Sequence, residues 1–215
     1  MTNAPRFIHL RTHTEYSLLE GAVPLKKLVK TCADKGYPAI AVTDTDNMFA
    51  ALEFSVLASG LGVQPILGCQ VSLAYDPPAP GEKLRMPAPV VLLAQSEAGY
   101  MNLMALNSCL YLPTDRPVPQ VTLEELEAHS DGILCLTGGA EGCLGKLVQT
   151  NQMPKARALL ERLACAFPDR LYVELQRHAG EDGQMMAAER VTERPFVEMA
   201  YEMGLPLVAT NDVYF

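Results

Sequence analysis

The stretch "YPAIAVTDTDNMFAALEF", residues 37–54, decides the fold class, because it joins a buried strand to a helix through a polar turn. Residues 38–44 form a continuous apolar run that ends in Asp44. Such runs are typical of strands that are buried on both faces, as in a parallel sheet. Residues 44–46 precede the helical pattern of "NMFAALEF" and suit a helix N-cap. The stretch therefore predicts one strand–helix unit with polar residues at the carboxyl end of its strand.

The same unit recurs along the chain. Helical patterns separate the apolar runs, and they are clearest at residues 22–37, 153–167 and 196–204. Proline-rich stretches at 75–89 and 112–120 are predicted to be loops. About seven strand–helix repeats indicate an α/β barrel or a doubly wound sheet. The predicted strands are residues 6–10, 38–44, 65–73, 89–95, 132–138, 170–176 and 205–212.

Composition limits the class of protein. The chain has 215 residues, of which 49% are hydrophobic, enough for one substantial core. Its net charge of -8 disfavours a main role in gripping the phosphate backbone of DNA. Six cysteines without a CxxC pair are typical of reduced, buried thiols in a cytosolic protein. The sequence has neither an evident signal peptide nor an apolar stretch long enough to span a membrane.

Polar side chains follow several of the predicted strands. In α/β sheets and barrels, functional residues gather at the carboxyl ends of the strands. His13, Asp44, His178 and Asp212 hold such positions and could converge on one mouth. Each of them taken alone is more often a helix cap or a satisfied loop residue than a ligand. Only their joint pattern favours a site.

That joint pattern resembles a known family. The stretches "FIHLRTHTEYSLLEGA", "YPAIAVTDTDNMFAALEF", "GVQPILGCQVSL", "VVLLAQSEAGYMNLMALNS", "LYVELQRH" and "LPLVATNDVYF" occur in the family's order. The chain resembles the PHP (polymerase and histidinol phosphatase) domain of bacterial DNA polymerase III alpha subunits. The resemblance implies a distorted seven-stranded (β/α)7 barrel, similar to a TIM barrel. It also implies that residues 1–215 are a PHP domain, truncated at its C-terminal end and without the polymerase domains.

The resemblance further implies a metal site that has lost most of its ligands. Metal-bearing members carry an HxH pair on the first strand, and here Arg11 takes the place of its first histidine. Arginine cannot deprotonate, so it brings a fixed positive charge to the place of a metal. A histidine expected near residue 89 is absent as well. The other positions that match ligands but cannot serve as such are Thr45, Gln70, Gly139 and Tyr214.

A few potential ligands remain at the matching positions. They are His13, Glu20 and Asp212, with Asp44 on the second strand and His178 as a further candidate. Because a buried guanidinium needs a partner, we expect Arg11 to pair with Glu20 or Asp212. The sequence thus predicts a vestigial polar pocket with no catalytic residue and no bound metal. A mechanism that depends on bridged metals would then be lost.

Three functions are compatible with the resemblance. The first is a catalytically inactive domain of the polymerase, which stiffens the remainder of the alpha chain and docks the proofreading exonuclease subunit. The second is an active metal-dependent phosphoesterase or 3′–5′ exonuclease. The third is a stand-alone histidinol-phosphatase-like enzyme, which the polymerase-type stretch "SEAGYMNLMALNS" disfavours. We favour the first, in the cytoplasm, with weak or no DNA binding and no membrane contact. Nucleotidyl transfer and its Mg²⁺ would belong to the polymerase domain of the parent chain.

Overall fold

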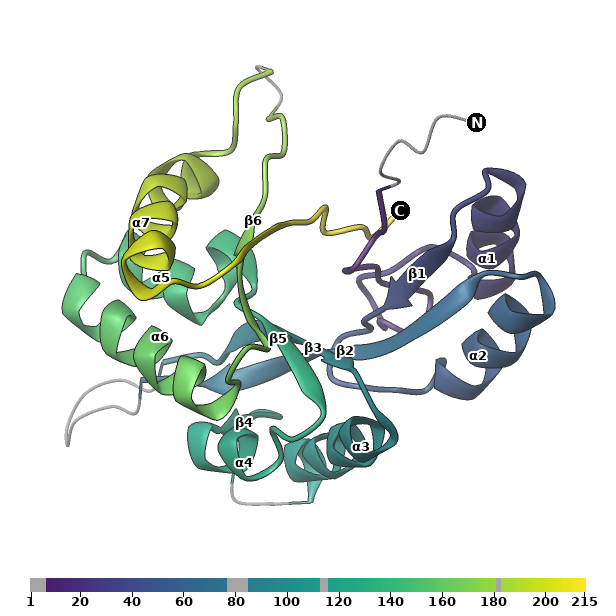
Figure 1. Cartoon of the computed structure of the whole chain (residues 1–215), viewed down its shortest axis with the longest axis horizontal. Helices are drawn as coiled ribbons and strands as arrows, with labels where there is room; N and C mark the ends of the chain where they lie inside the picture. Colours follow the sequence, from purple (N-terminus) through teal and green to yellow (C-terminus); the bar gives the residue numbers. More distant parts are fainter. Residues whose placement is uncertain (1–6, 77–84, 113–115, 181–182) are drawn as a thin grey trace.

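The computed structural model describes residues 7–76, 85–112, 116–180 and 183–215. Its core is a curled sheet that forms half a barrel, with helices around the outside (Figure 1). The order of the strands is β1-β2-β3-β5-β6-β7, and β4 pairs with β2 beside this path. The strands in the described part of the chain are β1 (Ala39–Val42), β2 (Gln64–Ala74), β3 (Ala88–Ala94), β4 (Val121–Thr122), β5 (Ile133–Leu136), β6 (Leu171–Leu175) and β7 (Leu207–Ala209).

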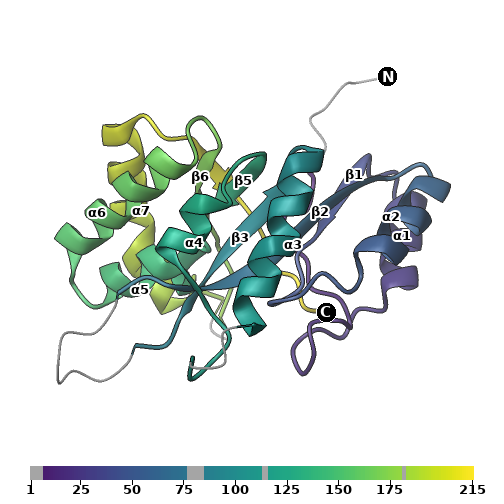
Figure 2. The ribbon, with the colours of Figure 1, turned by 90° about the horizontal axis from the view of Figure 1, so that it is seen from below.

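The helices form three groups around the sheet. Helices α1 and α2 lie at one end of the sheet, α5, α6 and α7 at the other, and α3 and α4 between them (Figure 2). Ser96 caps α3, and Thr122 with Glu125 forms a capping box on α4. The bounds are α1 (Leu25–Asp34), α2 (Ala51–Gly60), α3 (Glu97–Tyr111), α4 (Leu123–Ala128), α5 (Cys143–Gln149), α6 (Met153–Ala166) and α7 (Ala187–Met203), with the 3-10 helix η1 (Gly139–Glu141).

The sheet is mixed, whereas the apolar runs had suggested parallel strands. β3 runs antiparallel to both β2 and β5, and the other pairs are parallel. The reason lies in the connection between β2 and β3, where the sequence offers a proline-rich loop in place of a crossover helix. Residues 77–84 of that predicted loop lie outside the described residues, and β3 already begins at Ala88. The predicted α/β class with a distorted seven-stranded barrel is nevertheless confirmed, and the curled sheet forms half of such a barrel.

The first predicted strand, residues 6–10, is wrong for the part that the structure describes. Between residues 7 and 13 there is a single isolated bridge, Thr12 to Val213. The backbone N–H of Thr12 donates to Oγ1 of Thr43, 3.0 Å away, and not to a carbonyl. A side chain thus takes the place of one rung of the ladder, and no regular strand forms.

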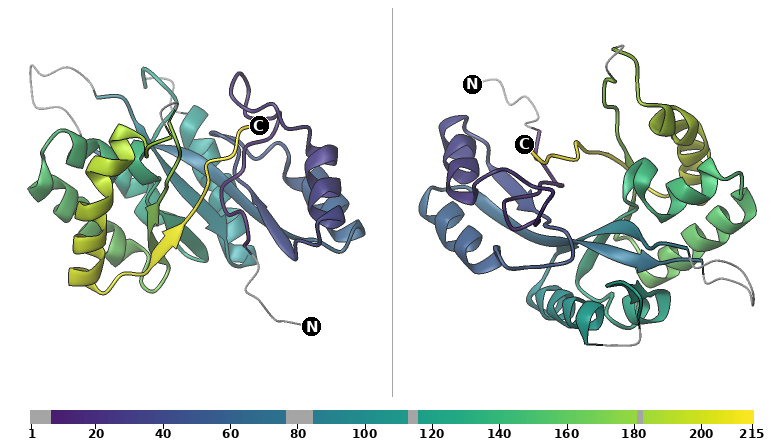
Figure 3. Two further views of the ribbon diagram at one scale, coloured as in Figure 1. Left: turned by 90° about the horizontal axis from the view of Figure 1, so that it is seen from above. Right: turned by 180° about the vertical axis from the view of Figure 1, so that it is seen from behind.

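The last predicted strand, residues 205–212, is shorter and more exposed than expected. β7 spans three residues, and Leu207 within it is exposed. Beyond β7 the chain crosses to the N-terminal segment, where the N–H of His13 donates to the carbonyl of Val213 over 2.8 Å. Figure 3 shows the C-terminal and N-terminal segments side by side. The residues around position 12 therefore join β1 to the end of the chain.

Side-chain alternation along β3 separates two cores. Val90 and Leu92 belong to a large core under the outer helices, whereas Val91 and Leu93 pack with Leu136 on the other face. Successive side chains of a strand point to opposite faces of the sheet. In the register of β2 and β3, Gln70 lies opposite Val91. The inner face of the half-barrel thus carries apolar side chains in its interior and polar side chains at its mouth.

All six cysteines are free, but they are not all buried as the sequence had suggested. Cys165 is exposed and Cys109 is partly buried. Burial raises the pKa of the Cys69 thiol to about 12, so this thiol stays protonated at neutral pH. None of the described helices combines the length and the apolar character that a membrane span requires.

Candidate functional site at the barrel mouth

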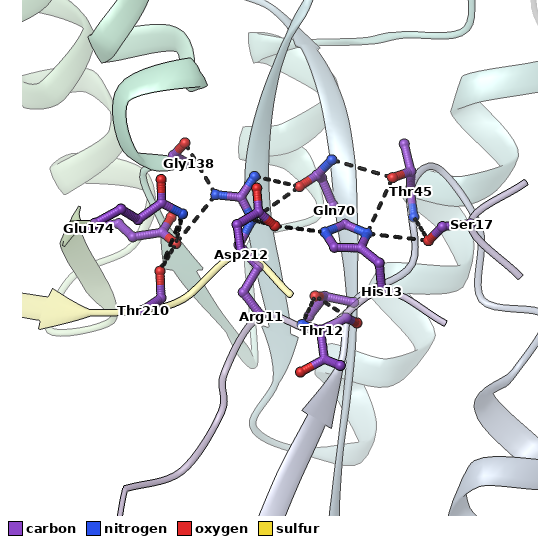
Figure 4. A network of polar contacts seen from close by, with 12 residues as sticks. Arg11, Thr12, His13, Ser17, Thr45, Gln70, Gly138, Glu174, Thr210 and Asp212 are labelled. Atoms are coloured by element: carbon purple, nitrogen blue, oxygen red, sulfur yellow. Dashed lines mark hydrogen bonds and ion pairs between the residues drawn. The ribbon is translucent and has the colours of Figure 1, made fainter. Parts of the chain in front are cut away.

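Arg11 lies at the centre of the mouth and is almost completely buried. Its Nε lies 3.0 Å from Oδ1 of Asp212, and its Nη1 lies 3.4 Å from Oε1 of Glu174. Nε and Nη2 donate to Oε1 of Gln70 over 3.1 and 2.6 Å, and Nη1 also donates to the carbonyl of Gly138 (Figure 4). The guanidinium thus meets two carboxylates and two neutral oxygens. Of the two partners that we expected, Asp212 is confirmed and Glu20 is not.

His13 is fully buried beside Arg11 and shares its carboxylate. Nε2 of His13 lies 3.0 Å from Oδ1 of Asp212, and Nδ1 lies 3.2 Å from Oγ of Ser17. The imidazole is stacked on the ring of Tyr214, with 4.1 Å between the ring centroids. Burial and the nearby Asp212 carboxylate raise the pKa of the Tyr214 phenol. Both ring nitrogens of His13 and one face of its ring therefore contact protein groups.

A chain of polar contacts leads from Arg11 to Glu20. Nε2 of Gln70 donates to Oγ1 of Thr45 over 3.3 Å, and this hydroxyl donates to Oε2 of Glu20 over 2.7 Å. The amide of Gln70 thus links the guanidinium on one side to the threonine on the other. Because each group uses its donors on a neighbour, the mouth is a connected network and not an open set of ligands.

Asp44 is buried and anchors the turn that follows Arg11. Its carboxylate accepts from the N–H of Thr14 over 2.6 Å, from Oγ1 of Thr14 over 2.8 Å and from Oγ of Ser17 over 2.7 Å. The suggestion that residues 44–46 cap the next helix is wrong, since α2 begins at Ala51 without a side-chain cap. The side chain of Asp46 instead binds the N–H and the hydroxyl of Ser72.

Gly139 leaves no room for a ligand side chain. Its φ of +62° is left-handed, and a Cβ atom at this position would overlap Oε1 of Gln176. Nε2 of Gln176 lies within 3.4 Å of Oε1 of Glu174 and of Oγ1 of Thr210. The space of a cysteine or histidine side chain is thus occupied by an amide.

His178 does not join the mouth in the contacts that the structure describes. Its Nδ1 and its backbone N–H both pair with the carboxylate of Glu189, at the start of α7. Arg177 pairs in the same way with Glu193. These contacts fasten the segment after β6 to α7. The other nine predicted pocket residues lie in or directly beside the network around Arg11 and His13.

The described residues do not suit a divalent metal. Among them, no three His, Cys, Asp or Glu side chains are grouped so that they could hold a metal ion. Arg11 places a permanent cation among the carboxylates, and the amide oxygen of Gln70 is already bound to it. Metal ligands must be free to offer lone pairs, and here both carboxylate oxygens of Asp44 and Oδ1 of Asp212 already contact protein donors.

Several residues of the network escaped prediction from the sequence, among them Glu174 and two of its neighbours. Glu174 is fully buried in β6, Gln176 follows that strand, and the hydroxyl of Thr210 donates to Oε1 of Glu174. One signal could have revealed Glu174, because a carboxylate inside the apolar run "RLYVELQ" needs a buried partner. Its Oε2 makes no hydrogen bond to any residue that the structure describes.

The comparisons with known proteins match this chain over most of its length. A family model described as "PHP domain" matches residues 9–178. The DNA polymerase III subunit alpha of Caulobacter vibrioides is 40% identical over 210 residues, and that of Rickettsia bellii is 34% identical over 210 residues. Each alignment covers 97% of this chain but only 18% and 17%, respectively, of the relative. The chain therefore spans less than a fifth of the length of these relatives.

Solved structures with the same fold are much more distant in sequence. An amidohydrolase from Chromobacterium violaceum has a TM-score of 0.59 at 14% identity, covering 96% of this chain and 87% of its own. A putative metal-dependent phosphoesterase from Bifidobacterium adolescentis has a TM-score of 0.55 at 11% identity, covering 97% and 87%. At such identities the likeness concerns the fold alone.

Proposed function

The chain belongs to the PHP domain family, and from this premise we propose that it is the PHP domain of a DNA polymerase III alpha subunit, inactive as a metal phosphoesterase. In this role it would act in the cytoplasm as a structural part of the polymerase and as the docking site for the proofreading exonuclease subunit. The observation that carries the proposal is Arg11, whose guanidinium lies between Asp212 and Glu174. An internal ion pair of this kind holds the mouth together without a divalent ion.

Inactivity follows from charge and from the lack of free ligands. PHP phosphoesterase chemistry needs metal ions that generate hydroxide and stabilise the phosphoryl group. In this chain a cation that cannot dissociate holds two of the nearby carboxylates. A divalent ion at the same place would be repelled by Arg11 and would have to displace it from a buried network.

Metal content and nuclease activity test this part of the proposal. The purified polypeptide should retain far less than one equivalent of zinc, manganese or iron after dialysis. It should also leave a 3′-labelled single-stranded DNA intact when manganese is added. Stoichiometric metal together with manganese-dependent cleavage would overturn the proposed inactivity. Metal without cleavage would overturn the account of the ligands only.

Docking of the exonuclease subunit needs a separate test. The net charge of -8 favours a protein partner over DNA, because DNA contact requires a basic face. Calorimetric titration of the polypeptide with the exonuclease subunit should give a defined stoichiometry. His13→Ala should change the affinity little, since His13 is fully buried and cannot touch a partner directly. Lack of binding by folded protein would reject the docking role.

A second candidate is an active metal-dependent phosphoesterase or 3′–5′ exonuclease. It is favoured by the pair of His13 and Asp212, which still lie 3.0 Å apart at the mouth. The phosphoesterase from Bifidobacterium adolescentis shares the fold. The manganese-dependent cleavage assay separates the two candidates, because only the second predicts a product.

A further inference from the structure

The turn at residues 17–21 presents a leucine in a backbone conformation that suits glycine. Leu19 has a φ of +68°, and its exposed fraction is 107%. The turn is closed by the N–H groups of Glu20 and Gly21, which donate to the carbonyl of Ser17 over 3.0 and 2.8 Å. A left-handed φ is uncommon for any residue but glycine, asparagine or aspartate. Neither the backbone nor packing within the described residues accounts for a leucine here.

More exposed apolar side chains lie on the elements around this turn. We call them, with Leu19, the apolar edge, and each of the others is at least 64% exposed. Nδ2 of Asn47, just before α2, donates to the carbonyl of Tyr16, so the turn is fixed to the start of that helix. The N–H of Ala22 donates to the carbonyl of Tyr214, which fixes the turn to the end of the chain. The apolar edge consists of Leu18, Leu19, Phe49, Leu52, Val56 and Phe215.

Helix α2 has an apolar outer face as well as an apolar inner face. Phe54 and Ala58 are buried against the sheet, whereas Leu52 and Val56 lie on the opposite side of the helix. Surface helices of globular proteins usually carry polar residues on that side. Helices that are apolar on all sides are typically buried. The composition of α2 thus predicts a cover on its outer face.

The charge around the apolar edge narrows the class of partner. The only charged residue of α2 is Glu53, which accepts from the hydroxyl of Tyr16 over 3.1 Å and pairs with Lys26 of α1 over 3.8 Å. The lysine beside the edge is thus already paired, and the six side chains of the edge itself carry no charge. Nucleic acids and acidic membranes attract basic surfaces, so neither suits this edge. The chemistry that suits it is an uncharged, apolar protein surface.

We propose that the apolar edge packs against a later part of the same polypeptide, of the kind that makes up most of the length of the relatives. This inference rests on the proposed function as a part of a polymerase chain. This chain spans only 18% of the Caulobacter vibrioides relative. Phe215, 90% exposed, belongs to the edge, so a continuing chain would leave beside the surface that it covers. A short tether gives a high effective concentration and favours such an internal contact.

Hydroxyl-radical footprinting of the full-length polypeptide tests the proposal, because the method reports the exposure of individual side chains. We expect Leu18, Leu19, Phe49 and Leu52 to be oxidised at least about fivefold more slowly than their exposure in the domain predicts. Tyr201 on α7, which is 77% exposed, serves as the internal reference. Oxidation of the edge at the rate expected from its exposure, relative to Tyr201, overturns the proposal. So does protection that develops only when the exonuclease subunit is added, since the occupant would then be that subunit.

Substitutions in the full-length polypeptide separate docking from folding. Leu19→Asn suits the left-handed backbone and removes no packing within the domain, so it should not lower the melting temperature of the domain. Together with Leu52→Asp it should nevertheless restore rapid oxidation of Phe49, whereas Val191→Asp, at another exposed position of α7, should not. Unchanged protection of Phe49 in the double variant overturns the proposal. The exonuclease titration is independent of this result, so a failure of the docking role remains distinguishable.

Discussion

Arg11 and Glu174 are separated by 163 residues in the chain, yet Nη1 of the arginine lies 3.4 Å from Oε1 of the glutamate, with both side chains almost fully buried. A buried ion pair costs desolvation, and it is stabilising only when further hydrogen bonds complete it. Here Gln70, Gly138 and Asp212 supply further oxygen partners for the guanidinium of Arg11. The pair joins the N-terminal segment to β6 across the mouth of the half-barrel.

Arg11→Met should lower the free energy of unfolding by about 3–5 kcal/mol, because it leaves the buried Glu174 without its cation. Urea unfolding of the domain measures the change. Arg194→Met is the matched control, since Arg194 is 87% exposed and its loss should change the free energy of unfolding far less. The double variant Arg11→Met/Glu174→Gln should recover part of the loss. No recovery would mean that the two side chains are not coupled.

Gly139→Ala should destabilise the domain more than Gly62→Ala does. Both glycines have a left-handed φ, +62° and +74°, but only at Gly139 would a Cβ overlap a neighbour, the amide of Gln176. The overlap should add about 1–3 kcal/mol to the backbone strain that both variants share. Thermal unfolding compares the two variants. Equal losses would show that Gln176 moves aside without cost.

Arg11→His alone should not create a catalytic metal site. The substitution restores one imidazole, but Gln70 stays neutral, Gly139 offers no donor and Tyr214 remains stacked on His13. Catalysis with bridged metals fails when bridging ligands are missing. Calorimetry with manganese and a 3′–5′ exonuclease assay check the variant. Manganese-dependent cleavage by it would refute the account of the lost ligands.

His9 should make stability fall at acid pH. Burial, and to a lesser extent the charge of Lys35, lower the pKa of the His9 imidazole from its usual 6.5. Just below pH 6.5 the unfolded chain therefore binds more protons at this residue than the folded one, and the free energy of unfolding decreases as the pH falls. The decrease ends once the pH is below the folded-state pKa.

Urea unfolding between pH 5 and pH 8 measures the effect of His9. His9→Gln should flatten the pH dependence in that window, because glutamine does not titrate. The rings of Phe7 and Tyr37 both contact His9 edge-on, so the variant is also expected to lose some stability at every pH. An unchanged slope would assign the pH dependence to other groups.

The pattern of apolar residues predicted most strands, but it did not predict how the N-terminal segment joins β1 to the end of the chain. Runs such as residues 38–44 and 170–176 carry their own signal, because continuous apolar residues must be buried. Residues 6–10 look similar, yet residues 7–10 form no strand, and just beyond them Oγ1 of Thr43 replaces a backbone acceptor for the N–H of Thr12. Whether a side-chain oxygen replaces a backbone acceptor depends on a neighbour that is distant in the sequence, so no local sequence pattern predicts it.

The pocket residues were predictable from the resemblance, but their partners were only partly so. Arg11 and Asp212 lie at positions that match ligands of the family, and the structure pairs them. Glu174 and Gln176 were not among the predicted positions, yet Glu174 pairs with Arg11 and Gln176 fills the space beside Gly139. Such contacts depend on side chains far apart in the sequence, so they appear only in the folded mouth.

The bridge between Thr12 and Val213 can form only after nearly the whole of these 215 residues has been synthesised. His13 meets Asp212, 199 residues later, so Arg11 and His13 leave the ribosome long before their common carboxylate is made. At ordinary rates of translation this interval is about 10–40 s. During that time the N-terminal segment around Arg11 lacks its contacts with Asp212 and Val213. The strands from β1 to β6 must pair without these contacts. A nascent chain that stalls before residue 212 would therefore leave Arg11 and His13 without their common carboxylate.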